Sequence, residues 1–143
     1  MRTIAAIVAL AALCAPVVAG TAAEPERVTV QHCLIGFKRS VPNKTVDRTK
    51  ADAGALAASI LERARAGEDF DALVKEYTDD RYPGTYTLVN EGIARRSAAE
   101  FERGAMATSF GDVAFSLAIG EVGLAKYHAA HSPYGWHVIR RLE

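Results

Sequence analysis

The sequence predicts an α+β domain, with helices packed around a small, mostly antiparallel sheet. Apolar segments typical of strands occupy residues 28–35 and 134–140, near the two ends of the chain, and each carries one histidine, His32 or His137. If these strands are neighbours, the two imidazoles can meet inside the sheet. The chain has 143 residues, of which 50% are hydrophobic and 24% charged, so its length and composition suit one domain with one core.

The first residues have the features of an export signal. Arg2 provides a positive start, residues 4–13 form a short apolar run, and residues 19–23 are small, as a cleavage site requires. The run is too short and too rich in alanine to span a membrane. We therefore expect residues 1–23 to be a signal peptide and residues 24–143 a mature domain that is exported to the periplasm or the extracellular space, with no stable membrane insertion after cleavage.

Cysteines and charge exclude several classes of partner. Cys14 follows Leu13, where a lipid-attachment site would have a small residue, so lipidation is disfavoured. Removal of the signal peptide would leave Cys33 without an intrachain disulfide partner, and strand alternation places it opposite His32, as a small buried hydrophobe. With 17 Lys and Arg against 17 Asp and Glu, the chain shows no basic footprint for nucleic acid.

The first two helices have clear start signals. Thr49 and Asp52 resemble a capping box, and Gly67 is a natural stop. Between them, one stripe of small and apolar residues repeats at helical spacing: Ala53, Leu56, Ala57, Ile60, Leu61 and Ala64. Asp69 can cap a second, shorter helix that ends near Asp79–Asp80. The apolar face of this second helix comprises Phe70, Leu73, Val74 and Tyr77.

A strand is expected after the second helix. Pro83–Gly84 forms a turn, and residues 85–89 have strand composition. Because residues 90–92 interrupt the pattern, we expect a short irregular strand or a hairpin arm.

Two short helices are expected in the second half. Ser97 and Glu100 form a capping box, which predicts a short helical turn that carries Phe101. Ser109 and Asp112 frame another short helix. Its inner side comprises Phe110, Val113, Ala114 and Leu117.

The remaining segments predict two strands. Residues 120–123 form a turn, residues 124–127 a strand, residues 128–133 a loop, and residues 135–142 the final strand.

Seven segments carry a resemblance to a known family through their order and spacing. They are VQHCLI at 30–35, RTKADA at 48–53, GEDF at 67–70, RGAM at 103–106, FGDVAFSL at 110–117, GEV at 120–122 and GWHVI at 135–139. From about Val28 to the C-terminus, the chain resembles the parvulin-type (PpiC-like) peptidyl-prolyl cis/trans isomerases. The resemblance implies a four-stranded, mostly antiparallel sheet surrounded by helices, with a shallow proline pocket on one side. Met106 and Phe110 would line that pocket, and Phe101 would lie at its edge.

The resemblance also implies a set of catalytic positions. His32 and His137 would be the paired core histidines, and Ser132 would supply a hydroxyl bonded to one of them. Asp80 would take a position that is Cys in some members and Asp in others, which argues against a covalent nucleophile. Resonance holds the bond before proline planar against a barrier of roughly 18–20 kcal/mol. Desolvating the planar amide and gripping the ring can lower this barrier, so no cofactor or metal is required.

Each of these residues also has a structural interpretation. The two histidines can be hydrogen-bonded core residues that set strand packing. Met106 and Phe110 stand at helical spacing, where ordinary core is the commoner explanation. Asp80 can be a helix-end carboxylate, and Ser132 a turn former.

Two other groups of residues are not expected to form binding sites. His128 and His131 are three positions apart, but no acidic or cysteine ligand completes a metal set, so no metal site is expected. Lys38, Arg39 and Lys44 occupy the loop where some parvulins bind phosphate next to proline. Their spacing does not single out a phosphate clamp, which favours a solvated basic loop.

One segment departs from the family pattern. Between Asp80 and Met106, parvulins usually have a compact glycine-rich stretch, whereas this chain has few glycines there and contains Tyr86, Asn90, Arg95 and Arg96. The segment borders the predicted pocket and can cover or reshape it.

The sequence therefore supports two hypotheses about function. The first is an exported prolyl isomerase that assists the folding of exported proteins and acts on proline-containing unfolded or extended polypeptides. The second is a catalytically weak, parvulin-like module that binds peptides or acts as a chaperone. The presence of His32, Met106, Phe110 and His137 favours catalysis, and the altered segment before Met106 favours divergence.

Overall fold

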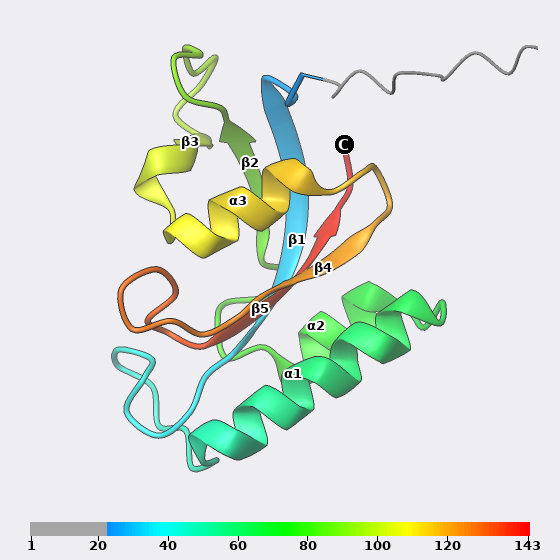
Figure 1. The fold of residues 1–143 in the computed structure, drawn as a ribbon, viewed down its shortest axis with the longest axis vertical. Coiled ribbons are helices and arrows are strands. Elements are labelled where there is room, and N and C mark those ends of the chain that lie inside the picture. Colours follow the sequence, from blue (N-terminus) through cyan, green and yellow to red (C-terminus); the bar gives the residue numbers. More distant parts are fainter. Residues whose placement is uncertain (1–22) are drawn as a thin grey trace, which may run out of the picture.

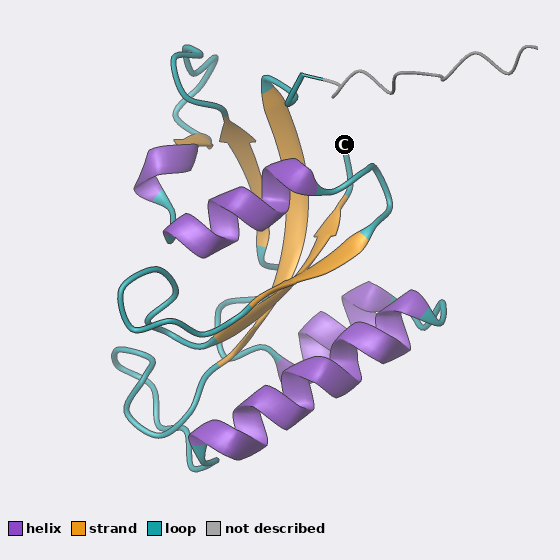
Figure 2. Ribbon diagram, viewed as in Figure 1, coloured by secondary structure: helices purple, strands orange, loops and turns teal. Residues whose placement is uncertain are grey.

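The computed structural model describes residues 23–143, which form a five-stranded sheet with helices on both faces (Figures 1 and 2). In chain order the elements are β1 (Arg27–Ile35), α1 (Lys50–Arg65), α2 (Phe70–Tyr77), β2 (Thr85–Val89), β3 (Glu100–Glu102), the 3-10 turn η1 (Arg103–Ala105), α3 (Thr108–Ser116), β4 (Val122–Ala125) and β5 (Trp136–Arg141). The predicted signal peptide lies outside the described residues, apart from its last position. Within the described part, no helix has the length and hydropathy needed to cross a membrane.

β1 lies at the centre of the sheet, whose strand order is β3-β2-β1-β5-β4. β1 pairs antiparallel with β2 and β5, β4 pairs antiparallel with β5, and β3 runs parallel to β2. The two histidine-bearing strands are therefore neighbours, with His32 opposite Ile139 and Leu34 opposite His137. The predicted α+β fold is confirmed. The sheet has five strands rather than four because the short edge strand β3 extends it.

Strand alternation divides the side chains of β1 between two hydrophobic cores. Cys33 belongs to the core that α1 and α2 cover, as predicted. Val28 and Val30 belong to the second core, together with Phe110 of α3. Figure 1 shows α1 and α2 on one face of the sheet and α3 on the other. His32 points to the α3 face, where its ring meets Phe110.

α1 and α2 begin at the predicted caps. Thr49 Oγ1 accepts the backbone N–H of Asp52 at 3.1 Å and bonds the Asp52 carboxylate at 2.7 Å. Asp69 Oδ1 accepts two backbone N–H groups of the first turn of α2. Between the helices Gly67 has a φ of 94°, a left-handed conformation that suits glycine at a helix end. The caps thus fix where both helices start against the sheet.

The helical turn predicted from Ser97 and Glu100 is wrong. These residues lead into β3, which pairs in parallel with β2. The Glu100 carboxylate accepts the backbone N–H of Arg96 at 2.6 Å and Arg27 Nε at 3.3 Å, which leaves no reciprocal capping bond to Ser97. Pairing with a distant strand therefore prevails over the local capping signal, and Phe101 belongs to an edge strand.

The start of α3 and the position of β4 also differ from the prediction. Ser109 lies inside α3, and the residue at the N-cap is Ala107, which has no side chain able to cap. Asp112 accepts a hydrogen bond from Arg103 Nη2 at 2.8 Å instead of framing the helix. β4 begins at Val122, two residues earlier than predicted, because pairing with β5 buries this side chain in the α1–α2 core.

Candidate active site

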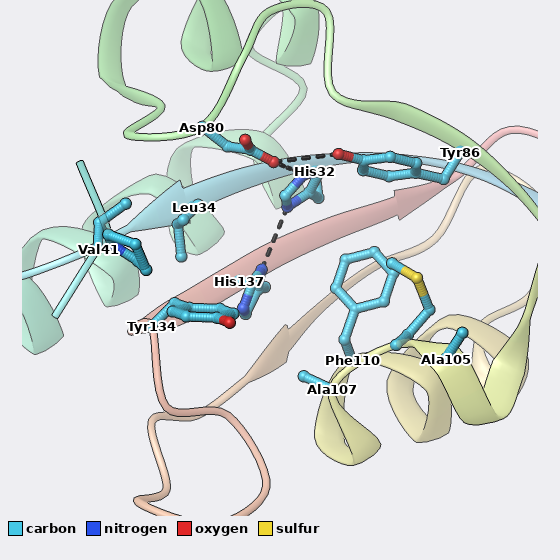
Figure 3. A pocket seen from close by; sticks show the side chains of 12 residues that line it. His32, Leu34, Val41, Asp80, Tyr86, Ala105, Ala107, Phe110, Tyr134 and His137 are labelled. Atoms are coloured by element: carbon cyan, nitrogen blue, oxygen red, sulfur yellow. Dashed lines mark hydrogen bonds and ion pairs between the residues drawn. The ribbon is translucent and has the colours of Figure 1, made fainter. Parts of the chain in front are cut away.

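A pocket of about 340 Å³ opens on the α3 side of the sheet (Figure 3). Segments that are far apart in the sequence contribute to it: β1, β2, β5, the loop after β1, the connection after α2, and the start of α3. Its lining residues are His32, Leu34, Val41, Pro42, Asp80, Tyr86, Ala105, Met106, Ala107, Phe110, Tyr134 and His137. Most of this lining is apolar, and the polar groups lie on the strand side.

Phe110 and Met106, the two residues expected to bind substrate, both line this pocket. Phe110 is only 1% exposed, so its ring forms the floor. The edges of this ring meet His32 and His137 at centroid distances of 5.2 and 5.3 Å. Met106 is more exposed and packs against the same core as Phe110. The start of α3 is held in place by the backbone N–H of Ser109, which donates to a carbonyl of the loop before β5 at 3.0 Å.

His32 and His137 meet through their ring nitrogens, with 3.2 Å between the two Nδ1 atoms (Figure 3). The second nitrogen of His32, Nε2, lies 3.1 Å from Oδ2 of Asp80. Because a carboxylate only accepts hydrogen bonds, Nε2 of His32 carries the proton. In the neutral ring, Nδ1 of His32 then accepts the Nδ1–H of His137. One hydrogen-bonded chain thus runs from His137 through His32 to Asp80.

Burial and hydrogen bonding shift the pKa at both ends of this chain. The hydrogen bond from His32 is the main cause that holds the pKa of Asp80 far below its usual range, although burial opposes it. Burial, followed by the neighbouring His32, lowers the pKa of His137 well below that of a free imidazole. At neutral pH the pocket therefore contains a carboxylate at Asp80 and a neutral ring at His137.

Tyr86 completes the polar side of the pocket, and its role was not predicted from the sequence. Its hydroxyl donates to Oδ2 of Asp80 at 3.1 Å, the same oxygen that His32 contacts. Strand alternation offers a signal for it, since Tyr86 stands two residues before Leu88, which is buried in the α3-side core. The contact with Asp80 depends on the turn before β2, which alternation does not describe.

Ser132 and Phe101 are not among the residues that line the pocket. Ser132 is fully buried, but its hydroxyl donates to the carbonyl of Gly135 at 2.9 Å rather than to a histidine. This bond fixes the turn that leads into β5. Phe101 does not line the pocket; its ring packs edge-on against Tyr86 at a centroid distance of 5.4 Å.

The other candidate residues lie outside the pocket. Lys44 Nζ is 3.7 Å from Asp79, which also pairs with an arginine, so part of the basic loop is neutralised. His128 and His131 stack at 4.5 Å. Within residues 23–143, no group of three or more possible metal ligands occurs. Cys33 is buried on the opposite face of the sheet, and burial raises the pKa of its thiol to about 12.

A comparison with protein families decides the identity of this fold. Residues 17–143 match the family model of the PPIC-type PPIase domain. The chain belongs to the parvulin-type peptidyl-prolyl cis/trans isomerases. The match covers the whole of the parvulin domain described here, and it confirms the resemblance that the sequence motifs indicated.

Two solved structures share the parvulin fold. The solution structure of TbPIN1 has a TM-score of 0.58 and 22% identity, covering 82% of this chain and 98% of that chain. The peptidyl-prolyl isomerase ESS1 from Candida albicans has a TM-score of 0.56 and 22% identity, covering 82% of this chain and 63% of that chain. At this level of identity the likeness concerns the fold alone.

Two curated relatives of the parvulin domain are foldases. The foldase protein PrsA of Caldanaerobacter subterraneus subsp. tengcongensis is 38% identical over 84 residues, which cover 59% of this chain and 24% of the foldase. The foldase protein PrsA 4 of Bacillus cereus is 33% identical over 84 residues, which cover 59% of this chain and 26% of the foldase. The parvulin domain thus corresponds to about a quarter of the length of these relatives.

Proposed function

We propose that this parvulin domain catalyses cis/trans isomerisation of the bond that precedes proline in unfolded or extended polypeptides. The observation that carries the proposal is the open pocket, in which an apolar floor at Phe110 faces a carboxylate at Asp80. A proline ring placed on Phe110 beside Met106 would bury apolar surface. The peptide bond attached to that ring would then lie in the same pocket as the carboxylate.

The reaction needs little beyond such a surface. Resonance in the planar amide sets the barrier, and twisting the bond removes this resonance and makes the proline nitrogen more basic. An apolar pocket disfavours the more polar planar amide, while a gripped ring leaves the carbonyl side free to rotate. This route forms no bond to the protein, and it needs neither a cofactor nor a metal.

We assign Asp80 an electrostatic role at the rotating amide. Resonance places partial negative charge on the carbonyl oxygen, so a nearby carboxylate disfavours the planar form relative to the twisted one. His32 and His137 hold this carboxylate in place through the hydrogen-bonded chain, and Ser132 stabilises the turn before β5. Cys33 cannot serve as a nucleophile because it lies buried on the other face.

NMR exchange spectroscopy on short peptides with one bond before proline tests this proposal. Uncatalysed exchange takes on the order of tens to hundreds of seconds, so catalytic amounts of protein should produce exchange cross-peaks that the peptide alone lacks. Met106→Ala and Asp80→Ala should each reduce the catalysed rate by about tenfold, which corresponds to about 1.4 kcal/mol of barrier. Ile119→Ala is the control, because Ile119 is an exposed apolar residue outside the pocket lining.

Three outcomes would contradict the proposal in different ways. Exchange no faster than that of the peptide alone, with folded wild-type protein, rejects catalysis. Peptide binding without exchange supports the alternative, a binding or chaperone module. Equal rates for the wild type and Met106→Ala reject this pocket as the site.

We further propose that the domain assists the folding of exported proteins, in the periplasm or outside the cell. The signal-like residues 1–23 support this location, and the foldase names of the two curated relatives support a role in folding. N-terminal sequencing of the protein recovered from its native cells should find a start at or near Glu24. Recovery of the chain with Met1 intact would contradict export through a cleaved signal.

A further inference from the structure

The Asp80 carboxylate receives two hydrogen bonds on one oxygen (Figure 3). Nε2 of His32 and the hydroxyl of Tyr86 each lie 3.1 Å from Oδ2. The Asp80 side chain is 33% exposed and lies on the connection between α2 and β2. These two donors, together with the backbone N–H of Arg81, hold the short side chain against the pocket instead of in water.

Tyr86 itself is held by rings from three elements. Its ring lies 5.3 Å from that of His32 on β1, 5.4 Å from that of Phe101 on β3 and 6.3 Å from that of Phe110 on α3, measured between centroids. Because these neighbours lie around the ring, the hydroxyl cannot swing away without breaking their packing. The packing therefore holds the phenol oxygen within hydrogen-bond distance of the Asp80 carboxylate.

We propose that Tyr86 is a positioning residue for the isomerisation, and that its hydroxyl fixes the Asp80 carboxylate against the pocket. The inference rests on the proposed function, because it assigns Tyr86 a task in the same reaction. Burial, followed by the charge of Asp80, raises the pKa of the phenol, so Tyr86 remains a hydrogen-bond donor at neutral pH. Tyr86 acts through the carboxylate and need not touch the reacting bond.

The substitution Tyr86→Phe tests the hydroxyl and keeps the ring. We expect kcat to fall about three- to tenfold with KM changed less than about twofold, since a hydrogen bond to a charged group is lost while the apolar wall remains. The matched control is Tyr82→Phe. The hydroxyl of Tyr82 donates a hydrogen bond to the carboxylate of Asp71 at 2.8 Å, and neither residue lines the pocket. Removing this hydroxyl should therefore leave kcat and KM at wild-type values.

A second background separates positioning from general support of the fold. In a chain that carries Asp80→Ala, the added Tyr86→Phe change should lower kcat no further, because the group that the hydroxyl holds is absent. If Tyr86→Phe lowers kcat by the same factor in the wild type and in Asp80→Ala, the inference is overturned. An unchanged kcat for Tyr86→Phe in the wild-type background would overturn it as well.

An NMR measurement without peptide tests the inference independently of catalysis. Three-bond couplings to the Asp80 carboxyl carbon report the χ1 rotamer of this side chain. We expect a single rotamer in the wild type and in Tyr82→Phe, and averaging between rotamers in Tyr86→Phe. A single Asp80 rotamer in Tyr86→Phe would refute the positioning role. If the rotamers differ between the wild type and Tyr86→Phe as expected, but the wild type does not catalyse exchange, only the proposed function is refuted.

Discussion

His32 donates one hydrogen bond to Asp80 and accepts one from His137, so both ring nitrogens of His32 are paired. The remaining nitrogen of His137, Nε2, is buried and has no hydrogen-bond partner among residues 23–143. A second proton on His137 would add a buried charge beside His32.

The lowered pKa of His137 makes stability depend on pH. The folded and unfolded states differ by one bound proton: below the ordinary histidine pKa of about 6.5, the unfolded chain binds a proton that the folded ring, with a pKa of about 3, does not. Stability should therefore fall as the pH falls through this window, by up to about 1.4 kcal/mol per pH unit from this group. The Asp80 carboxylate acts in the same direction only below about pH 4, where its unfolded form takes up a proton.

Urea denaturation between pH 4.5 and 7 checks this prediction. His137→Gln removes the titrating ring, so the slope of unfolding free energy against pH should be shallower than in the wild type. Equal slopes for the two proteins would contradict a neutral, buried His137.

The pairing of the histidines was predictable from sequence, but their partners were not. Alternation along two apolar strands places His32 and His137 on one face, and pairing of those strands brings the rings together. The partner of Ser132 depends on a local turn, which directs its hydroxyl to Gly135. The bond between Tyr86 and Asp80 depends on the path of the turn between them, and a strand pattern contains no information about that path.

η1 and the start of α3 form the element that carries Met106 and Phe110, and Arg103 anchors it. Nη1 of Arg103 bonds Glu24 at 2.7 Å and Asn90 at 3.1 Å, and the guanidinium lies 4.9 Å from the ring centroid of Phe115. The carbonyl of Arg103 also accepts the backbone N–H of Met106 at 3.1 Å. One side chain thus ties the N-terminal segment and the β2–β3 connection to the pocket wall.

Arg103→Ala should destabilise the fold by about 1–2 kcal/mol, because a partly buried hydrogen bond to Asn90, exposed ones to Glu24 and Asp112, and the packing of the guanidinium on Phe115 are lost together. KM for peptide should rise, since the segment that carries Met106 loses its anchor. The control is Arg95→Ala. Arg95 is half-exposed, and its Nε lies 3.9 Å from Oε1 of Glu102, so this exposed ion pair contributes about 0–1 kcal/mol. Urea denaturation and peptide kinetics measure both effects, and equal stability of the two variants would contradict an anchoring role for Arg103.

Elements with local signals were predicted well, and those that depend on distant partners were not. Thr49 and Asp69 cap α1 and α2 as expected, because capping involves residues within one turn. The capping box at Ser97 and Glu100 predicted a helical turn, but this segment pairs with β2, and Glu100 bonds Arg27 on β1. That competition is settled by tertiary contacts, which the local sequence pattern does not contain.

In the molecule as a whole, the sheet lies between the closed hydrophobic core under α1 and α2 and the pocket proposed for isomerisation. α1 and α2 cover one face with a closed core that includes Ile60, Leu73 and Val138. The pocket opens on the other face, beside α3 (Figure 3). Changes in the closed core should therefore alter folding without altering the pocket.

Ile60→Val tests this separation. Ile60 is fully buried on α1, so the loss of one methylene should cost about 0.5–1.5 kcal/mol of unfolding free energy. The rate of prolyl exchange per folded molecule should remain at the wild-type value. A reduced rate in fully folded Ile60→Val would show that the two faces are coupled.

The proposal that the pocket binds the proline ring is tested most directly by locating that ring in a bound peptide. Intermolecular nuclear Overhauser effects between a labelled protein and a peptide with one proline report contacts within about 5 Å, a range comparable to packed side chains. We predict contacts from the proline ring protons to the ε-methyl of Met106 and the ring of Phe110, and none to the methyls of Ile60. Proline contacts confined to other parts of the surface, while exchange is still accelerated, would contradict the account.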